Sequence, residues 1–168
     1  MSVPQPCRMS VDPVSGSVAR RNAARWQGKR VGLLGGSFNP AHRGHLHISR
    51  EALKRLRLDA VWWLVSPQNP LKSADGMAPL AVRLASARAM ARDPRIVPTD
   101  VERKLGTRYT VDTLEALVAL HPGTRFIWLM GGDNLQGFHR WRQWRRIVRV
   151  APIAVLLRPS YSGARRSA

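Results

Sequence analysis

His42 and His45 stand three residues apart in the string GGSFNPAHRGH, which fills positions 35–45. On the first turn of a helix this spacing puts both imidazoles on one side. Gly35 and Gly36 lack a Cβ, so a phosphate or a sugar can approach the backbone closely there. The N–H groups and the positive dipole end of a helix start also favour an anion. Together these features predict a cradle for a polyphosphate.

A strand that ends at the two glycines and a helix that starts near the histidines would hold this cradle in place. The apolar run from Val31 to Leu34 predicts a buried strand, which the pair Gly35–Gly36 stops. A helix over about residues 43–57 is predicted from apolar residues at helical spacing, namely Leu46, Ile48, Ala52, Leu53 and Leu56. The string fits neither the GxGxxG dinucleotide fingerprint nor the GxxxxGK[ST] phosphate loop.

Short apolar runs alternate with helical patterns along the rest of the chain. Further strands are predicted at 61–65, 96–97, 126–130 and 153–157. Helices are predicted at about 79–90, with Pro79 in the first turn, at 111–120 and at 133–149, the last in one or two pieces. Thr110 is the predicted N-cap of its helix. This alternation indicates an α/β fold: a Rossmann-like doubly wound parallel sheet of about five strands with flanking helices.

Turn-forming or polar residues follow three of the predicted strands. They are Gly35–Gly36, Ser66–Pro67 and Gly131–Gly132–Asp133. In such sheets ligands bind at the carboxyl ends of the strands, where the strand order reverses. We therefore expect these three segments to converge on one site.

The length of 168 residues is that of a single domain. Residues 1–28 hold prolines, serines and arginines without a sustained period, which predicts a disordered N-terminal extension or a start site placed too early. The domain is then expected at 29–168. No apolar run approaches the roughly 20 residues of a membrane span, and the N-terminus lacks the apolar stretch of a signal peptide. We therefore expect a cytoplasmic protein, and its single cysteine, Cys7, excludes an internal disulfide.

The formal net charge of +18 favours polyanionic partners. Charge alone does not distinguish nucleic acid from phosphorylated small molecules. Between Arg140 and Arg149 two tryptophans, Trp141 and Trp144, interleave with arginines, which keeps open a non-catalytic nucleic-acid-binding protein. Because basic residues are spread along the whole chain, no specific nucleic-acid partner is expected.

The string at 35–45 resembles the first motif of the HxGH nucleotidyltransferases. More narrowly, it resembles that of bacterial nicotinate-nucleotide adenylyltransferases, which reads GGxFxPxHxGH. Three later segments resemble the same family and extend the likeness to roughly residues 30–158: SPQNPLK at 66–72, GTRYTVDTL at 106–114 and GGDNLQGFHRW at 131–141. The resemblance implies adenylyl transfer from ATP, with Mg²⁺, to nicotinate mononucleotide. The products are deamido-NAD and pyrophosphate, and the reaction belongs to NAD biosynthesis.

The resemblance also implies roles for the residues that match the family's motifs. His42 and His45 match two histidines that contact the ATP phosphates, and Lys72 matches a basic position that neutralises phosphate charge. These three form the expected catalytic set. The implied ATP-binding residues are Gly35, Gly36, Ser37, Phe38, Gly44, Gly132 and Asp133. The implied nicotinate-nucleotide-binding residues are Asn69, Tyr109, Thr110 and Trp141.

Some of these residues also have a purely structural interpretation. Tyr109 and Thr110 match a pair near the nicotinate carboxylate, and Trp141 matches an aromatic residue that stacks on the pyridine ring. Thr110 and Asp133 are also suited to cap helices, and Lys72 to lie solvated at the surface. Packing is the role expected of three other tryptophans: Trp62, Trp63 and Trp144.

The sequence departs from the family after the fifth predicted strand. The family continues there with a Ser-Ser/Thr-x-x-Arg element that holds ATP, whereas this chain reads RPSYSGARRSA. Ser160, Ser162 and Arg165 do not align with that element. We therefore expect a C-terminally shortened domain whose ATP binding or turnover is weaker than that of a chain with the segment restored.

Two further interpretations of the chain stay open. A sister adenylyltransferase would use nicotinamide mononucleotide or phosphopantetheine as the acceptor, and a truncated paralogue would be inactive. The sequence does not decide between the acid and the amide mononucleotide, or whether the protein is a homo-oligomer. It also leaves open whether residues 1–28 belong to the native protein.

Overall fold

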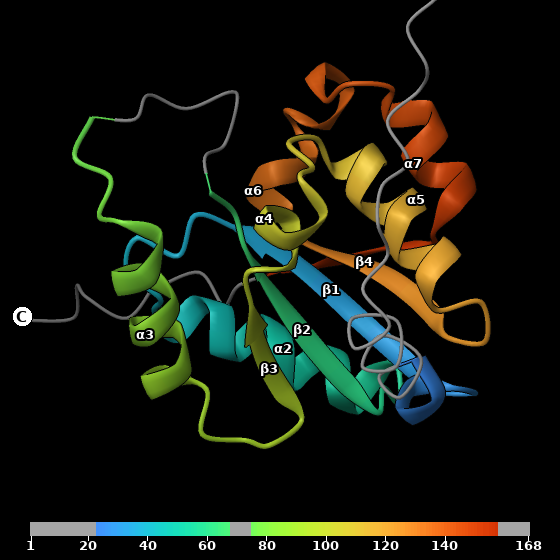
Figure 1. The fold of residues 1–168 in the computed structure, drawn as a ribbon, viewed down its shortest axis with the longest axis horizontal. Helices are drawn as coiled ribbons and strands as arrows, with labels where there is room; N and C mark the ends of the chain where they lie inside the picture. Colours follow the sequence, from blue (N-terminus) through green and yellow to red (C-terminus); the bar gives the residue numbers. More distant parts are fainter. Residues whose placement is uncertain (1–22, 68–74, 158–168) are drawn as a thin grey trace, which may run out of the picture.

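The computed structural model describes residues 23–67 and 75–157. Five parallel strands form one sheet in the order β3-β2-β1-β4-β5. Their bounds are Arg30–Gly36 (β1), Ala60–Val65 (β2), Ile96–Thr99 (β3), Arg125–Gly131 (β4) and Ile153–Leu156 (β5). The strand order reverses between β1 and β4, so the predicted doubly wound sheet of about five strands is confirmed (Figure 1).

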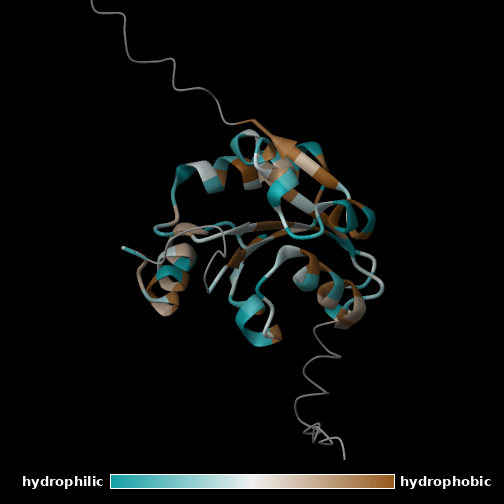
Figure 2. Ribbon diagram, turned by 90° about the horizontal axis from the view of Figure 1, so that it is seen from above, coloured by the Kyte–Doolittle hydropathy of each residue, from teal (hydrophilic) through white to brown (hydrophobic). Residues whose placement is uncertain are grey.

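Helices cover both faces of this sheet. Figure 1 shows α2 (Arg43–Arg55) and α3 (Leu80–Met90) on one side, and α5 (Thr110–Leu120) and α7 (Trp144–Val150) on the other. Every residue of β2 is buried, as expected for a parallel strand covered on both faces. Figure 2 shows the sheet edge-on between the two layers of helices. None of the described helices is long and apolar enough to cross a membrane.

The two layers enclose separate apolar cores. On one face Ile48 and Leu53 of α2 pack with Leu34 and Trp63 of the strands. On the other face the buried residues of α5 and α7 pack with those of β1 and β4, namely Leu114, Leu117, Ile147, Leu33 and Phe126. The helical spacing seen in the sequence thus corresponds to the buried face of each helix.

Three local features differ from the sequence-based expectations. Tyr109 is the N-cap of α5, so Thr110 is its first helical residue and not the predicted cap. A short helix, α4 (Val101–Leu105), has no counterpart among the predicted elements. The segment predicted as one or two helices is three pieces: α6 (Gly132–Leu135), a 3₁₀ turn η1 (Phe138–Arg140) and α7. Two backbone features break it, an extended Trp141 and a left-handed Gln143 with φ 50°.

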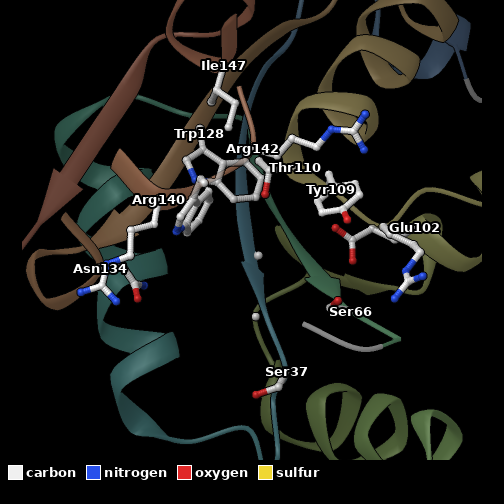
Figure 3. A pocket seen from close by; sticks show the side chains of 14 residues that line it. Ser37, Ser66, Glu102, Tyr109, Thr110, Trp128, Asn134, Arg140, Arg142 and Ile147 are labelled. Atoms are coloured by element: carbon white, nitrogen blue, oxygen red, sulfur yellow. The ribbon is translucent and has the colours of Figure 1, made fainter. Parts of the chain in front are cut away.

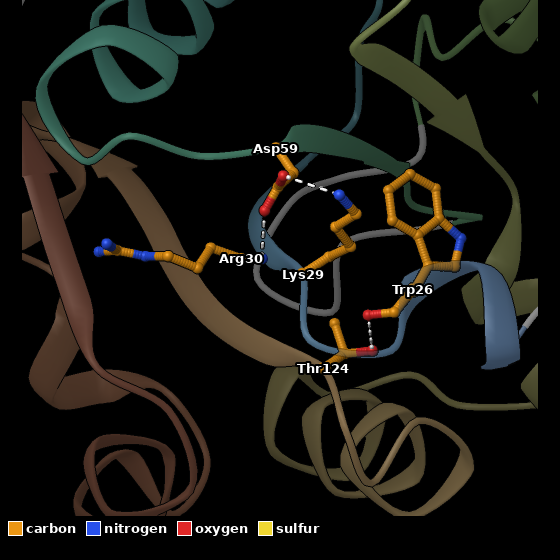
Figure 4. A network of polar contacts seen from close by, with 5 residues as sticks. All are labelled: Trp26, Lys29, Arg30, Asp59 and Thr124. Carbon is orange, nitrogen blue, oxygen red and sulfur yellow. Dashed lines mark hydrogen bonds and ion pairs between the residues drawn. The ribbon is translucent and has the colours of Figure 1, made fainter.

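Residues 23–28, which composition assigns to the N-terminal extension, are packed against the sheet. Residues 23–26 form a helical turn, and the ring of Trp26 meets that of Trp62 edge-on at 5.2 Å. Thr124 donates a hydrogen bond from Oγ1 to the carbonyl of Trp26 at 2.9 Å (Figure 4). Lys29 pairs with Asp59 at 3.3 Å beside it. These contacts close the amino ends of β1 and β4, away from the glycines at their carboxyl ends.

Candidate active site

The turn between β1 and α2 is held by its own side chains. Phe38, with φ 47°, is 1% exposed, and its ring stacks on Trp63 at 5.1 Å. Asn39 donates to the carbonyl of Gly76 at 3.1 Å and accepts from the backbone N–H of Ala78 at 3.2 Å. A buried ring and two long-range hydrogen bonds therefore fix the path of the predicted phosphate cradle.

The two motif histidines cap α2. His42 is the N-cap, and its Nδ1 accepts from the backbone N–H of Gly44 at 3.1 Å. In return Nδ1 of His45 accepts from the backbone N–H of His42 at 3.2 Å. This is a capping box built from two imidazoles. Because each Nδ1 is an acceptor, the ring proton sits on Nε2, so each ring presents an N–H donor on its other side.

A cavity of about 380 Å³ opens at the carboxyl ends of β1, β2 and β4. Six residues assigned to ATP or acceptor binding from the sequence line it, namely Gly35, Gly36, Ser37, Tyr109, Thr110 and Trp141. Ser66, from the second of the three strand ends expected to converge, lines it as well. Figure 3 shows Tyr109 and Glu102 on one side of the cavity, and Trp128, Arg140 and Asn134 on the other. The cavity lies at the switch point between β1 and β4, where ligands bind in sheets of this kind.

Other residues predicted for the site lie outside this cavity. Neither His42 nor His45 lines it, and neither do Phe38, Gly44, Gly132 and Asp133. The histidines are nevertheless adjacent to it, because a Cβ placed on Gly36 would lie 3.9 Å from Nε2 of His45. Gly36 therefore borders both the cavity and the pair His42 and His45 at the start of α2, which we call the histidine corner. Asn69 and Lys72, like the C-terminal residues 158–168, lie outside the described residues.

Asp133 is part of the short helix α6. The N-cap of that helix is Gly131, so Asp133 lies in its first turn and does not cap it. A Cβ on Gly131 would come within 2.5 Å of Oδ1 of Asp133, so the carboxylate folds back over the end of β4. This keeps an exposed carboxylate close to the carboxyl edge of the sheet.

Arg83 of α3 joins the loops around the cavity and was not identified from the sequence. Its side chain is buried, and its guanidinium donates to the carbonyls of Ser37 at 2.6 Å and Ser66 at 2.7 Å. It also donates to the carbonyls of Pro67 at 2.9 Å and Ala78 at 2.8 Å. One cation thus ties the end of β1 to the end of β2. Its only trace in the sequence is an arginine within the apolar face of α3.

Glu102 supplies a buried carboxyl to the cavity wall and was also missed. It accepts from Oγ1 of Thr113 at 3.5 Å. Burial raises the pKa of Glu102 above its ordinary value, and hydrogen bonds from Ser66 and Thr113 oppose that rise. The residue lies just before the segment GTRYTVDTL, in the helix α4 that the sequence did not predict.

Arginines make much of the cavity rim basic. Arg108, Arg140 and Arg142 line it, and the guanidinium carbon of Arg142 lies 4.6 Å from the ring centre of Tyr109. Arginine suits both aromatic stacking and the binding of carboxylate or phosphate. The cavity therefore fits an anionic ligand with an aromatic ring. Within the described ranges no group of three His, Cys, Asp or Glu residues could hold a metal ion.

Comparisons with known proteins agree with this geometry. Residues 33–167 match a family model described as cytidylyltransferase-like. A relative from Parvibaculum lavamentivorans, named probable nicotinate-nucleotide adenylyltransferase, is 63% identical over 135 residues, which cover 80% of this chain and 67% of that protein. One of the same name from Cereibacter sphaeroides is 64% identical over 129 residues, covering 77% of this chain and 69% of its own length.

Solved structures show the same fold at much lower identity. One is nicotinic acid mononucleotide adenylyltransferase of Plasmodium falciparum complexed with NaAD, at 18% identity and a TM-score of 0.69. The match covers 80% of this chain and 67% of that one. The same Plasmodium enzyme complexed with APC matches at 16% identity and a TM-score of 0.62, covering 80% and 77% of the two chains. At these identities the likeness establishes the arrangement of the sheet and helices.

Proposed function

The chain belongs to the cytidylyltransferase-like family and, within it, to the nicotinate-nucleotide adenylyltransferases, and on this premise we propose that it adenylylates nicotinate mononucleotide. A phosphate oxygen of the mononucleotide attacks the α-phosphorus of ATP. The new O–P bond forms as the bond to the bridging oxygen breaks, and pyrophosphate leaves. The products are deamido-NAD and pyrophosphate, and no covalent intermediate with the protein is required.

The continuity between the cavity and the histidine corner carries this proposal. Gly36 borders both, and Ser37 lines the cavity one residue further along. We assign the cavity to the acceptor nucleotide, and the start of α2 with its two imidazoles to the ATP phosphates. An acceptor phosphate held over Gly36 would then face the α-phosphate across a short distance, which is the geometry that in-line displacement needs.

The two imidazoles are assigned to charge stabilisation. In each ring Nδ1 accepts from the backbone of the first turn, so Nε2–H is the donor that we assign to phosphate oxygen. Donors held in place before the reaction stabilise charge as it develops on the α-phosphate and the departing pyrophosphate. Lys72 keeps its proposed role in neutralising phosphate charge. Mg²⁺ is assigned to the triphosphate of ATP, where it neutralises charge, and not to a cage of protein ligands.

The acceptor end of the cavity suits a pyridine ring that carries a carboxylate. Thr110 opens α5, so N–H groups at the helix start and the positive dipole end are available to that carboxylate. The rings of Tyr109 and Trp141 line the same cavity, and Arg142 lies over Tyr109. A flat ring with an anionic substituent therefore finds both stacking surfaces and positive charge there.

A comparison of acceptors tests the proposal. Product formation from ATP is measured with nicotinate mononucleotide, nicotinamide mononucleotide and phosphopantetheine at matched concentrations. We expect the nicotinate compound to have the highest kcat/KM, because its carboxylate matches the basic rim. Higher activity with either of the other acceptors would assign the chain to a sister reaction.

A pair of tryptophan variants tests the assignment of the acceptor pocket. Trp141→Ala removes a cavity-lining ring, and we expect the KM for nicotinate mononucleotide to rise about tenfold or more, since stacking contributes roughly 1–3 kcal/mol. Trp144→Ala is the control, because Trp144 packs on Phe138 at 6.0 Å and does not line the cavity. Equal effects of the two substitutions would contradict the pocket assignment.

A further inference from the structure

A series of ring contacts leads from the core of the α2 face to the histidine corner. The buried ring of Trp63 stacks on that of Phe38, with centres 5.1 Å apart and an interplanar angle of 24°. Phe38 in turn contacts the imidazole of His45 at 4.4 Å, and that imidazole contacts the ring of His42 at 3.9 Å. Rings packed in this way restrict one another's rotation, so the position of Trp63 bears on the orientation of His45.

Hydrogen bonds through Ser49 join the same two residues a second time. Nε1–H of Trp63 donates to Oγ of Ser49 at 2.7 Å, and that hydroxyl donates to the backbone carbonyl of His45 at 2.8 Å. A serine hydroxyl can donate and accept at once, so both bonds form together. Trp63 and Ser49 are each 0% exposed, so water does not compete for these groups. The ring of His45 and its backbone are thus both connected to Trp63.

Ser49 is not a residue that the formation of α2 requires. The buried residues of α2, in the part of the chain that the structure describes, are Ile48, Ser49, Ala52 and Leu53, and Ser49 alone among them is polar. A carbonyl inside a helix already accepts from the N–H four residues further on. A serine hydroxyl bonded to the same carbonyl slightly destabilises the helix. The hydroxyl therefore serves the connection between Trp63 and the first turn of α2, where the motif histidines lie.

We propose that Ser49 and Trp63 are positioning residues, which hold the imidazole of His45 where its Nε2–H meets phosphate oxygen. The inference rests on the proposed function, because that function assigns His45 to the ATP phosphates. A donor stabilises developing charge only if it is held in place before the reaction, and a misplacement of about 1 Å can cost on the order of 10²-fold in rate. Trp63 thus has a role beyond the packing that its place in an apolar strand predicts.

Two substitutions remove the two ends of the buried hydrogen bond. Ser49→Ala removes the hydroxyl, and Trp63→Phe removes the indole N–H while keeping an aromatic ring. We expect each to lower kcat about 5- to 20-fold, and to leave the KM for nicotinate mononucleotide within about twofold of wild type, because neither residue lines the acceptor cavity. The double variant should be no slower than the slower single variant, because both changes break one connection. All rates are measured below the melting temperature of every variant, so that lost stability alone does not lower kcat.

Trp62 provides a matched control in the same strand. It precedes Trp63 in β2, so its side chain lies on the opposite face of the sheet, where it meets Trp26 and Phe126 edge-on. Trp62 is also buried, but its Nε1 has no hydrogen-bond partner among the described residues. Trp62→Phe therefore removes the same atoms from a buried site without breaking a connection to His45. We expect its kcat to stay within about twofold of wild type.

Histidine NMR follows the imidazole without turnover. The chain has five histidines, so a ¹⁵N-histidine-labelled sample gives five sets of ring signals. The set that is absent from the His45→Ala spectrum belongs to His45. Ser49→Ala removes no ring, so a movement of the His45 signals in this variant reports a change in the surroundings or orientation of the imidazole. We expect that movement in Ser49→Ala and unchanged His45 signals in Trp62→Phe.

The outcomes distinguish this inference from the proposed function. A wild-type kcat in Ser49→Ala, His45 signals that do not move in that variant, or an equal loss of kcat in Trp62→Phe would overturn the positioning role. A wild-type protein that releases no pyrophosphate from ATP with nicotinate mononucleotide would instead overturn the proposed function. If Trp63→Phe does not fold, Ser49→Ala decides, because it removes one buried hydroxyl and leaves every ring in place.

Discussion

The imidazole rings of His42 and His45 lie with their centres 3.9 Å apart. His42 accepts a hydrogen bond from the backbone N–H of Gly44, and His45 accepts one from the backbone N–H of His42. Phe38 packs on His45 at 4.4 Å and closes the group from the side of β1. The ring of His42 is therefore both the N-cap of α2 and a group proposed to bind phosphate. The first prediction separates the two roles of His42.

Replacement of His42 by asparagine or alanine should affect stability and catalysis differently. Asparagine is a good N-cap, so His42→Asn keeps the unfolding free energy near wild type, whereas His42→Ala lowers it by about 1 kcal/mol. Both variants lose the imidazole donor, so we expect both to lower kcat/KM by roughly 10²- to 10³-fold. Thermal unfolding and steady-state kinetics on the same samples check this. Retention of activity in His42→Asn would mean that the ring serves only as a cap.

Alanine at the two glycines of the cradle should also have different effects. A Cβ on Gly35 would lie 2.6 Å from the Trp128 ring, so Gly35→Ala must displace that ring and should lower the melting temperature. A Cβ on Gly36 would come no nearer than 3.4 Å to the ring of Phe38, so the fold should accept Gly36→Ala nearly unchanged. We expect Gly36→Ala to raise the KM for ATP by about tenfold, because the added methyl group occupies the phosphate approach. Unchanged ATP kinetics would place the phosphates elsewhere.

Removal of the Arg83 guanidinium should destabilise the whole carboxyl edge of the sheet. Four backbone carbonyls lose their donor in Arg83→Met, and we expect a loss of about 3 kcal/mol of unfolding free energy. For a chain of this size that corresponds to a melting temperature roughly 6–12 °C lower. Arg88→Met, on an exposed position of the same helix, is the matched control. Similar melting temperatures for the two variants would refute the positioning role.

The carboxyl of Glu102 should make stability depend on pH. Burial raises its pKa above the ordinary value, so the folded chain holds this proton more tightly than the unfolded chain does. The stability that protonated Glu102 contributes is present below the unfolded pKa and is lost as pH rises through the folded pKa. Glutamine at position 102 cannot ionise, so Glu102→Gln does not lose this stability as pH rises. Its melting temperature relative to wild type should therefore rise between about pH 4 and neutrality.

A series of thermal melts across that pH range checks this behaviour. Glu51→Gln serves as the control, because Glu51 pairs with Arg55 at the surface of α2 at 2.6 Å and is not part of the cavity. The rise with pH is predicted for Glu102→Gln and is read as the difference between the two variants. A Glu102→Gln difference that stays constant with pH would mean that Glu102 titrates alike in the folded and unfolded chains.

The features predictable from the sequence were those set by local pattern. Periodicity located the strands and the long helices, and the order of turn residues located the carboxyl edge. Five of the residues chosen from motifs line the cavity because they end β1, follow it or open α5 at that edge, and Trp141 lines it from the segment between η1 and α7. The segment 133–149 was expected in one or two helical pieces, but the place of the break at Trp141 and Gln143 was not predicted, since a left-handed glutamine leaves no mark in an apolar pattern.

The remaining site residues depend on contacts between distant segments. Arg83 is recognisable only once the ends of β1 and β2 are placed beside α3. Trp128 was part of an apolar strand, and its place in the cavity wall follows from Gly35, whose missing Cβ leaves room for the end of the indole. The arginines between Arg140 and Arg149 lie in different surroundings. Arg140 and Arg142 line the cavity, whereas Arg146 pairs with Glu115. It therefore does not present one continuous surface for nucleic acid.

Pyrophosphate release from ATP tests the central claim most directly. It is measured with Mg²⁺, in the presence and absence of nicotinate mononucleotide, for the wild type, for His45→Ala and for His47→Ala as a control on the same helix. We expect release to require the mononucleotide and to fall by roughly 10²- to 10³-fold in His45→Ala alone. Pyrophosphate release at the same rate without the mononucleotide, or a wild-type rate in His45→Ala, would contradict a site that is shared by the two imidazoles, the glycines and the acceptor pocket.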